Sequence, residues 1–160
     1  MAVAENVRDE AKPAEVAARQ RRLSVLAKAE VKDLLTLWKQ VGLDPAVELL
    51  RGPEAGLVAV QGRIGGSGQS FHVGEVSATR VTVRIGTGHV GHAMISGRDT
   101  RKAQLVAVID ALAQDPDHAG MIERVIIAPL EQQANEADAR LRAETAATRV
   151  NFFTMVRGED

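Results

Sequence analysis

The sequence has no cysteine and no tyrosine, and aromatic residues make up only 2% of it. The absence of cysteine excludes disulfides, thiolate metal sites and a cysteine nucleophile. The few aromatic residues are one tryptophan and three phenylalanines, so the core must be built from Val, Leu, Ile and Ala. These side chains bury less area per residue than aromatic ones. The stability of the domain is therefore expected to depend in part on contacts with a partner.

Long apolar runs and a strong net charge are also missing. No stretch approaches the roughly 20 apolar residues of a membrane span. The first fifteen residues carry acidic side chains and no apolar run, which is unlike a secretory signal. The formal net charge of -1 gives no overall attraction to nucleic acid or to a membrane surface. With 160 residues, 45% hydrophobic and 26% charged, the chain is expected to be one soluble domain in the cytoplasm.

Two amphipathic helices are predicted at the start of the fold. Residues 1–12 show no periodicity and are expected to be disordered. Pro13 suits a first helical position and opens a helix over 13–29. A second helix over 30–41 has apolar residues at positions 31, 34, 35, 38 and 41 and ends at Gly42. We expect residues 13–160 to form a single α+β domain, with its C-terminal helix and tail as an arm that docks on a partner.

The middle of the chain holds eleven of the fourteen glycines and predicts an antiparallel meander of four to five strands. Alternation is clearest in TRVTVRI (79–85), where Arg80 and Arg84 point away from the apolar side chains. Further strands are predicted over 56–64, 70–76 and 89–96, and a fifth over 47–51. The strand over 56–64 is expected to have Val58 and Val60 on one face and Gln61 and Arg63 on the other.

The second half of the chain predicts more helix. Asp99 suits the cap of a helix with apolar residues at 105, 108, 109 and 112, which Asp115–Pro116 is expected to end. The short apolar segment RVIIAPL (124–130) is interpreted as an edge strand. A long helix over 129–148 carries only a thin apolar stripe, so it should be marginal in water unless something packs on it.

Two glycine-rich segments look like nucleotide-binding motifs but lack the required context. QGRIGGSGQS (61–70) has neither the lysine nor the following helix of a phosphate-binding loop, and a hairpin connection is favoured. GTGHVG (86–91) matches the dinucleotide fingerprint G-x-G-x-x-G, but a strand-like segment follows where that fingerprint requires a helix. A small independent nucleotide-binding enzyme built on GTGHVG is therefore the least favoured of the functions considered.

No nucleophile–base arrangement or carboxylate pair stands out, and the catalytic residues are unknown. His89 and His92 are an odd number of positions apart on a predicted strand, which favours ordinary surface residues over a metal site. The arginines of the sheet are better candidates, because guanidinium groups suit phosphate and phosphonate oxygens and equally the carboxylates of a partner. The alternative is a solvated outer face with Glu75 as counter-charge. The candidate anion-binding residues are Arg63, His72, Arg80, Arg84 and Arg98.

The C-terminal segment TRVNFFTMVRGED (148–160) contains two of the three phenylalanines. Left free, its apolar side chains would expose a patch to water. We expect the segment to dock on the core of the domain or, preferably, on another subunit. The predicted interface residues are Phe152, Phe153, Met155, Val156 and Arg157.

Several of these segments resemble the G subunit of the bacterial carbon–phosphorus lyase system, the PhnG family. The resemblance spans about residues 21–158, and GRD before a helix together with the FFTMVRG terminus is its most specific part. His92 stands where an aromatic residue is expected in the family. The segments that carry the resemblance are RRLSVLAKA, GLVAVQGRIGGSGQSFHVGEVSATRVTVRI, GHAMISGRDTRKAQLVAVIDAL, VIIAPLE and TRVNFFTMVRGED.

The resemblance implies a role in phosphonate catabolism. Such subunits act with H, I and L subunits in displacing adenine from ATP by methylphosphonate, which gives alpha-D-ribose 1-methylphosphonate 5-triphosphate. The J subunit later breaks the carbon–phosphorus bond. The resemblance thus implies a hetero-oligomeric transferase complex whose I-type subunit is the chief partner of this chain, with H-, J- and L-type subunits also present.

The net charge of -1 already gives no reason to expect a nucleic-acid or membrane partner. No cofactor is expected to bind this chain alone, since ATP is a substrate of the complex that the resemblance implies. The known chemistry of the system is assigned to the I and J chains, so no catalytic residue is carried over. A scaffold role in assembly is expected. Direct contact of the sheet arginines with phosphate or phosphonate is the alternative.

Overall fold

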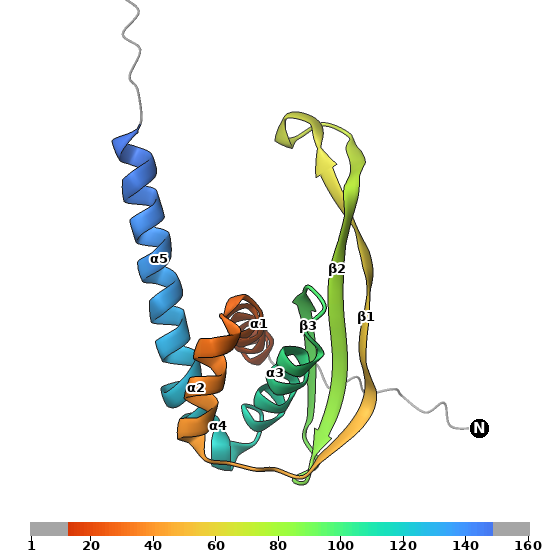
Figure 1. Ribbon diagram of the computed structural model, residues 1–160, viewed down its shortest axis with the longest axis vertical. Coiled ribbons are helices and arrows are strands. Elements are labelled where there is room, and N and C mark those ends of the chain that lie inside the picture. The colour runs from red at the N-terminus through yellow and green to blue at the C-terminus, as the bar shows by residue number, and fades with distance from the viewer. Residues whose placement is uncertain (1–12, 149–160) are drawn as a thin grey trace, which may run out of the picture.

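The computed structural model describes residues 13–148, which form an α+β fold around a three-stranded antiparallel sheet in the order β1–β2–β3. Figure 1 shows helices on one side of the sheet and two projections, the β1–β2 hairpin and α5, that leave the body in the same direction. The predicted disordered residues 1–12 and the tail 149–160 lie outside the described residues. The elements are α1 (Pro13–Lys28), α2 (Val31–Val41), β1 (Val47–Arg63), the 3₁₀ turn η1 (Ile64–Gly66), β2 (Ser70–Ile85), β3 (Val90–Ser96), α3 (Thr100–Leu112), α4 (Pro116–Ile122), the π-helical segment η2 (Glu123–Ile127) and α5 (Ala128–Ala147).

The two N-terminal helices and the antiparallel meander are confirmed, but the sheet has fewer and longer strands than predicted. The strands expected over 47–51 and 56–64 are both part of β1, and those expected over 70–76 and 79–85 are both part of β2. Pairing of β1 with β2 continues through three irregularities, two with the extra residue in β1, on either side of Arg51, and one with the extra residue in β2. The glycine-rich segment between them is a hairpin connection, as predicted, with Gly65 and Gly66 at positive φ.

One of these irregularities lies in β2. Val60 pairs with Gly74 and its neighbour Gln61 pairs with His72, so Val73 is the extra residue of a bulge in β2. β1 has no extra residue at this point and keeps its alternation, which agrees with the prediction that Val60 and Gln61 lie on opposite faces. A Cβ atom added at Gly62 would meet the side chains of Val73 and Phe71, so these two side chains share one face of the hairpin.

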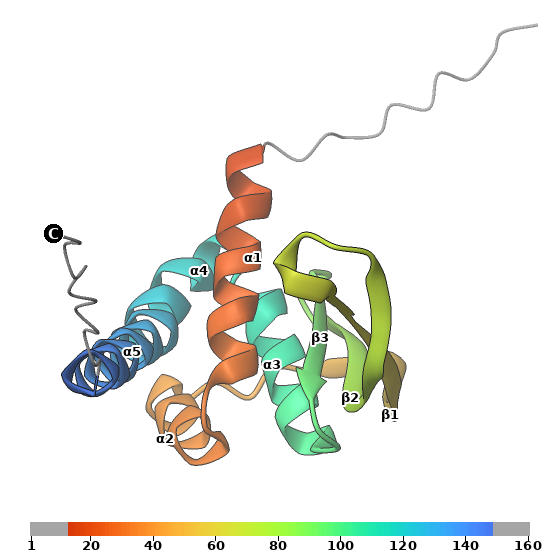
Figure 2. The same cartoon turned by 90° about the horizontal axis from the view of Figure 1, so that it is seen from above.

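The inner face of the sheet is covered by α3, and the apolar side chains that the alternation of 79–85 assigns to one face are buried there. Val81, Val83 and Ile85 are at most 3% exposed. In Figure 2, α3 lies between the sheet and α1, and contacts with β2, β3 and α1 agree with this placement. The predicted cap is also confirmed, because the carboxylate of Asp99 accepts the backbone N–H of Lys102 at 2.8 Å.

The segment predicted as an edge strand is helical, because η2 and the start of α5 include it and the chain is helical from Pro116 to Ala147. Ile122, Ile126 and Leu130 are four residues apart and at most 3% exposed, which is a helical spacing that the dense apolar run concealed. Pro129 cannot donate to the carbonyl four residues earlier, and this fits the wider π turn before it. Asp115–Pro116 also begins a helix, α4, that was not predicted.

A buried ion pair joins α1, α3 and β3. Asp110 of α3 is 1% exposed, and its carboxylate accepts Arg19 Nη2 at 2.6 Å and Arg19 Nε at 3.1 Å. The same carboxylate accepts the backbone N–H of His92 at 2.9 Å, while Gln114 Nε2 donates to the carbonyl of Val90 at 2.9 Å. Side chains of α3 and of the turn that follows it thereby satisfy backbone groups on the outer edge of β3, where no further strand pairs within residues 13–148.

β3 and α3 approach each other most closely at Gly91. A Cβ atom added there would lie 1.9 Å from the carbonyl oxygen of Ala107 and 2.7 Å from the nitrogen of Ala111. Both atoms belong to the backbone of α3 and cannot rotate away, so only glycine allows this contact. The last glycine of GTGHVG thus serves strand–helix packing. The strand that follows the motif confirms that its context is not that of a dinucleotide site.

Replacing Asp110 with alanine is expected to lower the free energy of unfolding by about 3–5 kcal/mol, because Arg19 loses its buried partner and the N–H of His92 loses its acceptor. Urea unfolding of the full-length chain measures this loss. The control is Arg84→Ala, which removes an exposed pair with Glu48 and is expected to change the same free energy by less than about 1 kcal/mol. Equal losses in the two variants would contradict a structural role for the Asp110 network.

Replacing Gly91 with alanine is expected to cost about 3 kcal/mol or more, since the backbone of α3 must move away from β3. The matched control is Gly56→Ala, because a Cβ at Gly56 meets nothing within 4 Å and its φ is not positive. That control is expected to stay within about 1 kcal/mol of the parent chain in thermal or urea unfolding. A tolerated Gly91→Ala would mean that β3 and α3 are not held at this distance.

Candidate functional site

The outer face of the sheet, opposite the helices, presents cross-strand rows of polar side chains. Within each row the side chains come from neighbouring strands and point the same way. These rows lie on the side of β2 that the alternation of 79–85 assigns to Arg80 and Arg84. The rows are Arg51–Thr82–His92, then Glu54–Arg80–Met94, and Glu48–Arg84–Val90.

Two guanidinium groups on this face share one carboxylate. Glu54 Oε1 accepts Arg80 Nε at 2.6 Å and Arg51 Nε at 3.1 Å. The hydrogen bond from Arg80, followed by that from Arg51, holds the pKa of Glu54 below its ordinary value, so Glu54 is ionised at neutral pH. All three side chains are about half exposed and water screens the pairs. The group carries a net positive charge, and Glu54 contacts the Nε atom of each arginine.

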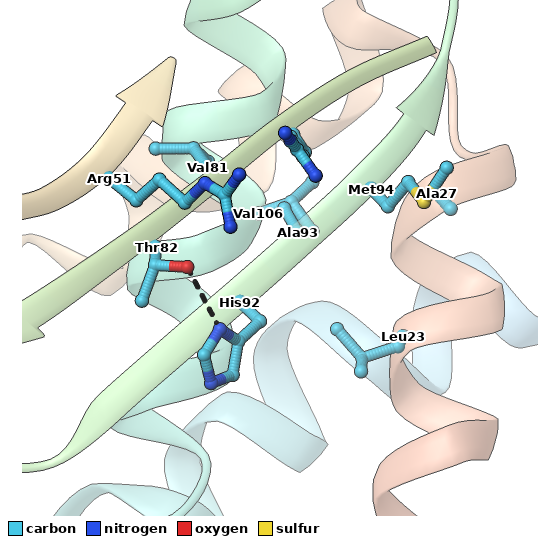
Figure 3. A pocket seen from close by; sticks show the side chains of 10 residues that line it. Leu23, Ala27, Arg51, Val81, Thr82, His92, Ala93, Met94 and Val106 are labelled. Atoms are coloured by element: carbon cyan, nitrogen blue, oxygen red, sulfur yellow. Dashed lines mark hydrogen bonds between the residues drawn. The ribbon is translucent and has the colours of Figure 1, made fainter. Parts of the chain in front are cut away.

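A cavity of about 360 Å³ lies beside these arginines, at the β3 edge of the sheet. Figure 3 shows Arg51, Thr82 and His92 around it, with Leu23 and Ala27 of α1 on the far side. Thr82 Oγ1 and His92 Nδ1 are hydrogen-bonded at 3.0 Å. Leu23, Ala27 and Met94 give the cavity an apolar wall, and its volume is within the range of about 300–1,000 Å³ that is usual for small-molecule pockets.

The predicted anion-binding residues lie on the sheet without forming one site. Arg80 lines the cavity, whereas Arg84 lies outside its lining and donates to Glu48 at 3.1 Å. The counter-charges of these two arginines are therefore Glu54 and Glu48, not Glu75.

The other three predicted residues lie away from the cavity. Arg63 donates to the carbonyl of Gly68 at 3.2 Å near the tip of the hairpin, and Arg98 is exposed in the turn before α3. His72 lies opposite Gln61 on the hairpin. Twelve positions along β2 separate His72 from Arg84, which corresponds to about 40 Å of extended strand. These residues cannot hold one small anion together.

Sequence alternation misses Arg51. In an uninterrupted strand this residue would share the face of Val47 and Leu49, on the side of the helices. The register shifts on both sides of Arg51 turn it to the outer face, opposite Thr82. The signal that could have revealed this is Gly52–Pro53 inside a strand pattern, since such residues often mark a bulge.

The two histidines considered as a metal pair have separate surroundings. His89 Nδ1 is 3.0 Å from Thr87 Oγ1 in the β2–β3 turn, and His92 contacts Thr82 on the outer face. Within residues 13–148, no three His, Asp or Glu side chains are grouped so that they could hold a metal ion. None of the helices in that range is long and apolar enough to cross a membrane.

A second surface is formed by the distal part of the β1–β2 hairpin, residues 55–76, here called the arm. β3 pairs only with residues 78–84 of β2, so the arm is a two-stranded ribbon. It carries large apolar side chains that are 36% to 69% exposed. The sequence predicted apolar faces here, but no helix among residues 13–148 covers them. The side chains are Leu57, Val58, Val60, Ile64, Phe71, Val73 and Val76.

Comparison with known proteins identifies the family. The model of the family described as phosphonate metabolism protein PhnG matches residues 17–158. The chain belongs to the PhnG family. It is 46% identical over 148 residues to a relative from Rhizobium meliloti (strain 1021), with 91% of this chain and 92% of the relative covered. That relative is named alpha-D-ribose 1-methylphosphonate 5-triphosphate synthase subunit PhnG. The family resemblance noted in the sequence is thereby confirmed.

Proposed function

We propose that this chain is a subunit of the complex that forms alpha-D-ribose 1-methylphosphonate 5-triphosphate from ATP and methylphosphonate with release of adenine. Family membership and the name of the Rhizobium relative support this role in phosphonate metabolism. Within that complex the chain acts in assembly, and its partners are the other carbon–phosphorus lyase subunits, the I-type subunit above all. The observation that carries the assembly role is the arm, with apolar side chains exposed on both faces.

The arm has the properties of a protein–protein interface in an isolated subunit. An isolated two-stranded hairpin is marginally stable in water. Covering the seven half-exposed apolar side chains would contribute roughly 1 kcal/mol each, on the order of 7 kcal/mol in total. The loss of translational and rotational freedom on association costs about 4–15 kcal/mol. The gain from the arm lies within the range of this cost, so the arm alone leaves little or no net affinity and further contacts would strengthen the complex.

The open edge of β1 offers such a contact. Val90 and His92 have their edge groups bonded to α1 and α3, but β1 forms the other edge of the sheet and pairs with β2 alone in the described part of the chain. Free N–H and C=O groups along an edge can pair with an added strand. A partner strand placed on β1 along the arm would bond to the backbone and cover apolar side chains at once.

The helix α5 offers another contact. Its start is fixed, because Leu130 is 3% exposed and Arg21 of α1 forms ion pairs with Glu131 and Glu123. From residue 132 to 147 every side chain is exposed, and Leu141 is 62% exposed. A helix that buries so little of itself needs tertiary contacts to be stable. The thin apolar stripe predicted for the helix over 129–148 thus lies on a helix that extends from the body. No other element among the described residues packs on this part of the helix.

Replacing Leu57 and Val73 together with serine is expected to lower the yield of partner subunits that co-purify with the chain about tenfold or more, since apolar contact area is lost from the arm. The measurement is co-expression of the tagged full-length chain with the other subunits, followed by quantification of each subunit. Both side chains are 61% exposed, so the fold of the chain itself should be retained.

The matched control is Leu35→Ser, which removes an equally large side chain that is 45% exposed on α2, far from the arm in sequence and in Figure 1. It is expected to leave the partner yield unchanged. Full recovery of the partners with the Leu57 and Val73 double variant, or an equal loss with Leu35→Ser, would refute the arm as the interface.

The tail that follows α5 is a further proposed contact, and its predicted interface residues lie outside the described residues. Deleting residues 151–160 removes Phe152, Phe153, Met155 and Val156. The shortened chain is expected to keep its unfolding midpoint but to co-purify less of its partners. Partner recovery equal to that of the full-length chain would exclude the tail from the interface.

A further inference from the structure

We propose that the cavity beside Arg51 and Arg80 is a binding site for a phosphoryl or phosphonyl oxyanion. The proposal concerns a site that is distinct from the arm, and it rests on the proposed function only for the choice of compounds to test. It assigns the two arginines as the anion-binding groups and Thr82 with His92 as neighbouring polar groups. Arg51 was not among the residues predicted from the sequence.

The first argument is the arrangement of the guanidinium groups. Glu54 bonds to the Nε atoms of Arg80 and Arg51, at 2.6 Å and 3.1 Å, and so holds the two groups side by side. The Nη atoms of both arginines take no part in these contacts with Glu54. Two guanidinium groups present planar forks of donors that match the oxygens of a tetrahedral phosphoryl group. One carboxylate between two arginines leaves a net positive charge that attracts an anion.

The second argument is the polar pair next to the arginines. Thr82 is in the same cross-strand row as Arg51 and His92, and all three line the cavity. When the hydroxyl of Thr82 donates to His92 Nδ1, the proton of the neutral imidazole is on Nε2, which becomes a further donor. The side chains of Arg51, Thr82 and His92 thus lie at one end of the same cavity.

The third argument is the opposite wall. Leu23 and Ala27 of α1 and Met94 of β3 are apolar, and Figure 3 shows them across the cavity from Thr82 and His92. A ligand with an anionic head and a small apolar or sugar body would have both parts satisfied there. A hollow of about 360 Å³ has the size of a small molecule, which favours such a ligand over an exposed carboxylate of a partner protein.

The test is calorimetric titration of the isolated full-length chain with inorganic tripolyphosphate and, separately, with methylphosphonate, at near-physiological salt. The arm substitutions Leu57→Ser and Val73→Ser are included to reduce the exposed apolar surface of the isolated chain, and neither residue lines the cavity. Binding of at least one probe is expected. Arg51→Ala and Arg80→Ala are each expected to weaken it tenfold or more. Both arginines are more than half exposed, so neither variant should change the thermal unfolding midpoint.

The matched control is Arg84→Ala. Arg84 is on the same face and strand as Arg80, but it is bonded to Glu48 and does not line the cavity. Four positions of extended strand place it about 13 Å from Arg80, beyond the screening length of about 8 Å at physiological salt. Its removal is expected to change the affinity by less than twofold.

Three outcomes would overturn the proposal. Absence of binding for both probes excludes an oxyanion site in this chain. An equal loss of affinity in Arg84→Ala indicates diffuse attraction by the face and not a site. Absence of binding together with reduced partner recovery in Arg51→Ala and Arg80→Ala assigns the arginines to a carboxylate of a partner subunit. Because the titration uses the isolated chain, its result is independent of whether the arm mediates assembly.

Discussion

The carboxylate of Asp110 is the point on which the folded body depends. It is enclosed between α1, α3 and β3, where an unpaired charge would be strongly unfavourable, and Arg19 from α1 supplies the opposite charge. The carboxylate of Asp110 also accepts a hydrogen bond from the backbone N–H of His92. One residue of α3 therefore fixes the position of the first helix and closes part of the β3 edge. The other edge of the sheet, on β1, pairs with no further strand within residues 13–148.

The pattern of apolar residues predicted the body of the fold well, because burial there follows regular geometry. Val81, Val83 and Ile85 alternate and lie under α3, and Gly42 ends α2 in a left-handed conformation. The prediction was wrong where a dense run of apolar residues hid the helical periodicity of the buried ones. Arg124–Leu130 has the density of apolar residues expected of a strand, but its buried side chains, Ile126, Ile127 and Leu130, have the spacing of one helix face and belong to a continuous helix.

Strand continuity was underestimated for a related reason. Glycine in a strand pattern was read as an end, whereas β1 keeps its pairing with β2 through bulges on either side of Arg51 in β1 and at Val73 in β2. A bulge changes the face of the residues beside it, and this cannot be inferred from alternation. Arg80 could therefore be proposed from the sequence and Arg51 could not. The long-range neighbours of Arg80, such as Glu54 and Leu23, depend on how the strands and α1 are placed in space.

The parallel course of the hairpin and α5, both leaving the same side of the body in Figure 1, affects how tightly a complex would be held. A partner subunit that contacts both the β1–β2 hairpin and α5 is held at two points by the same chain. Once the first contact has formed, the second is intramolecular and is governed by an effective concentration instead of by the amount of protein in solution. Two individually weak contacts can then give slow dissociation, since both must open before the neighbour leaves. The geometry of the body would thus contribute to the lifetime of the assembly without adding any contact of its own.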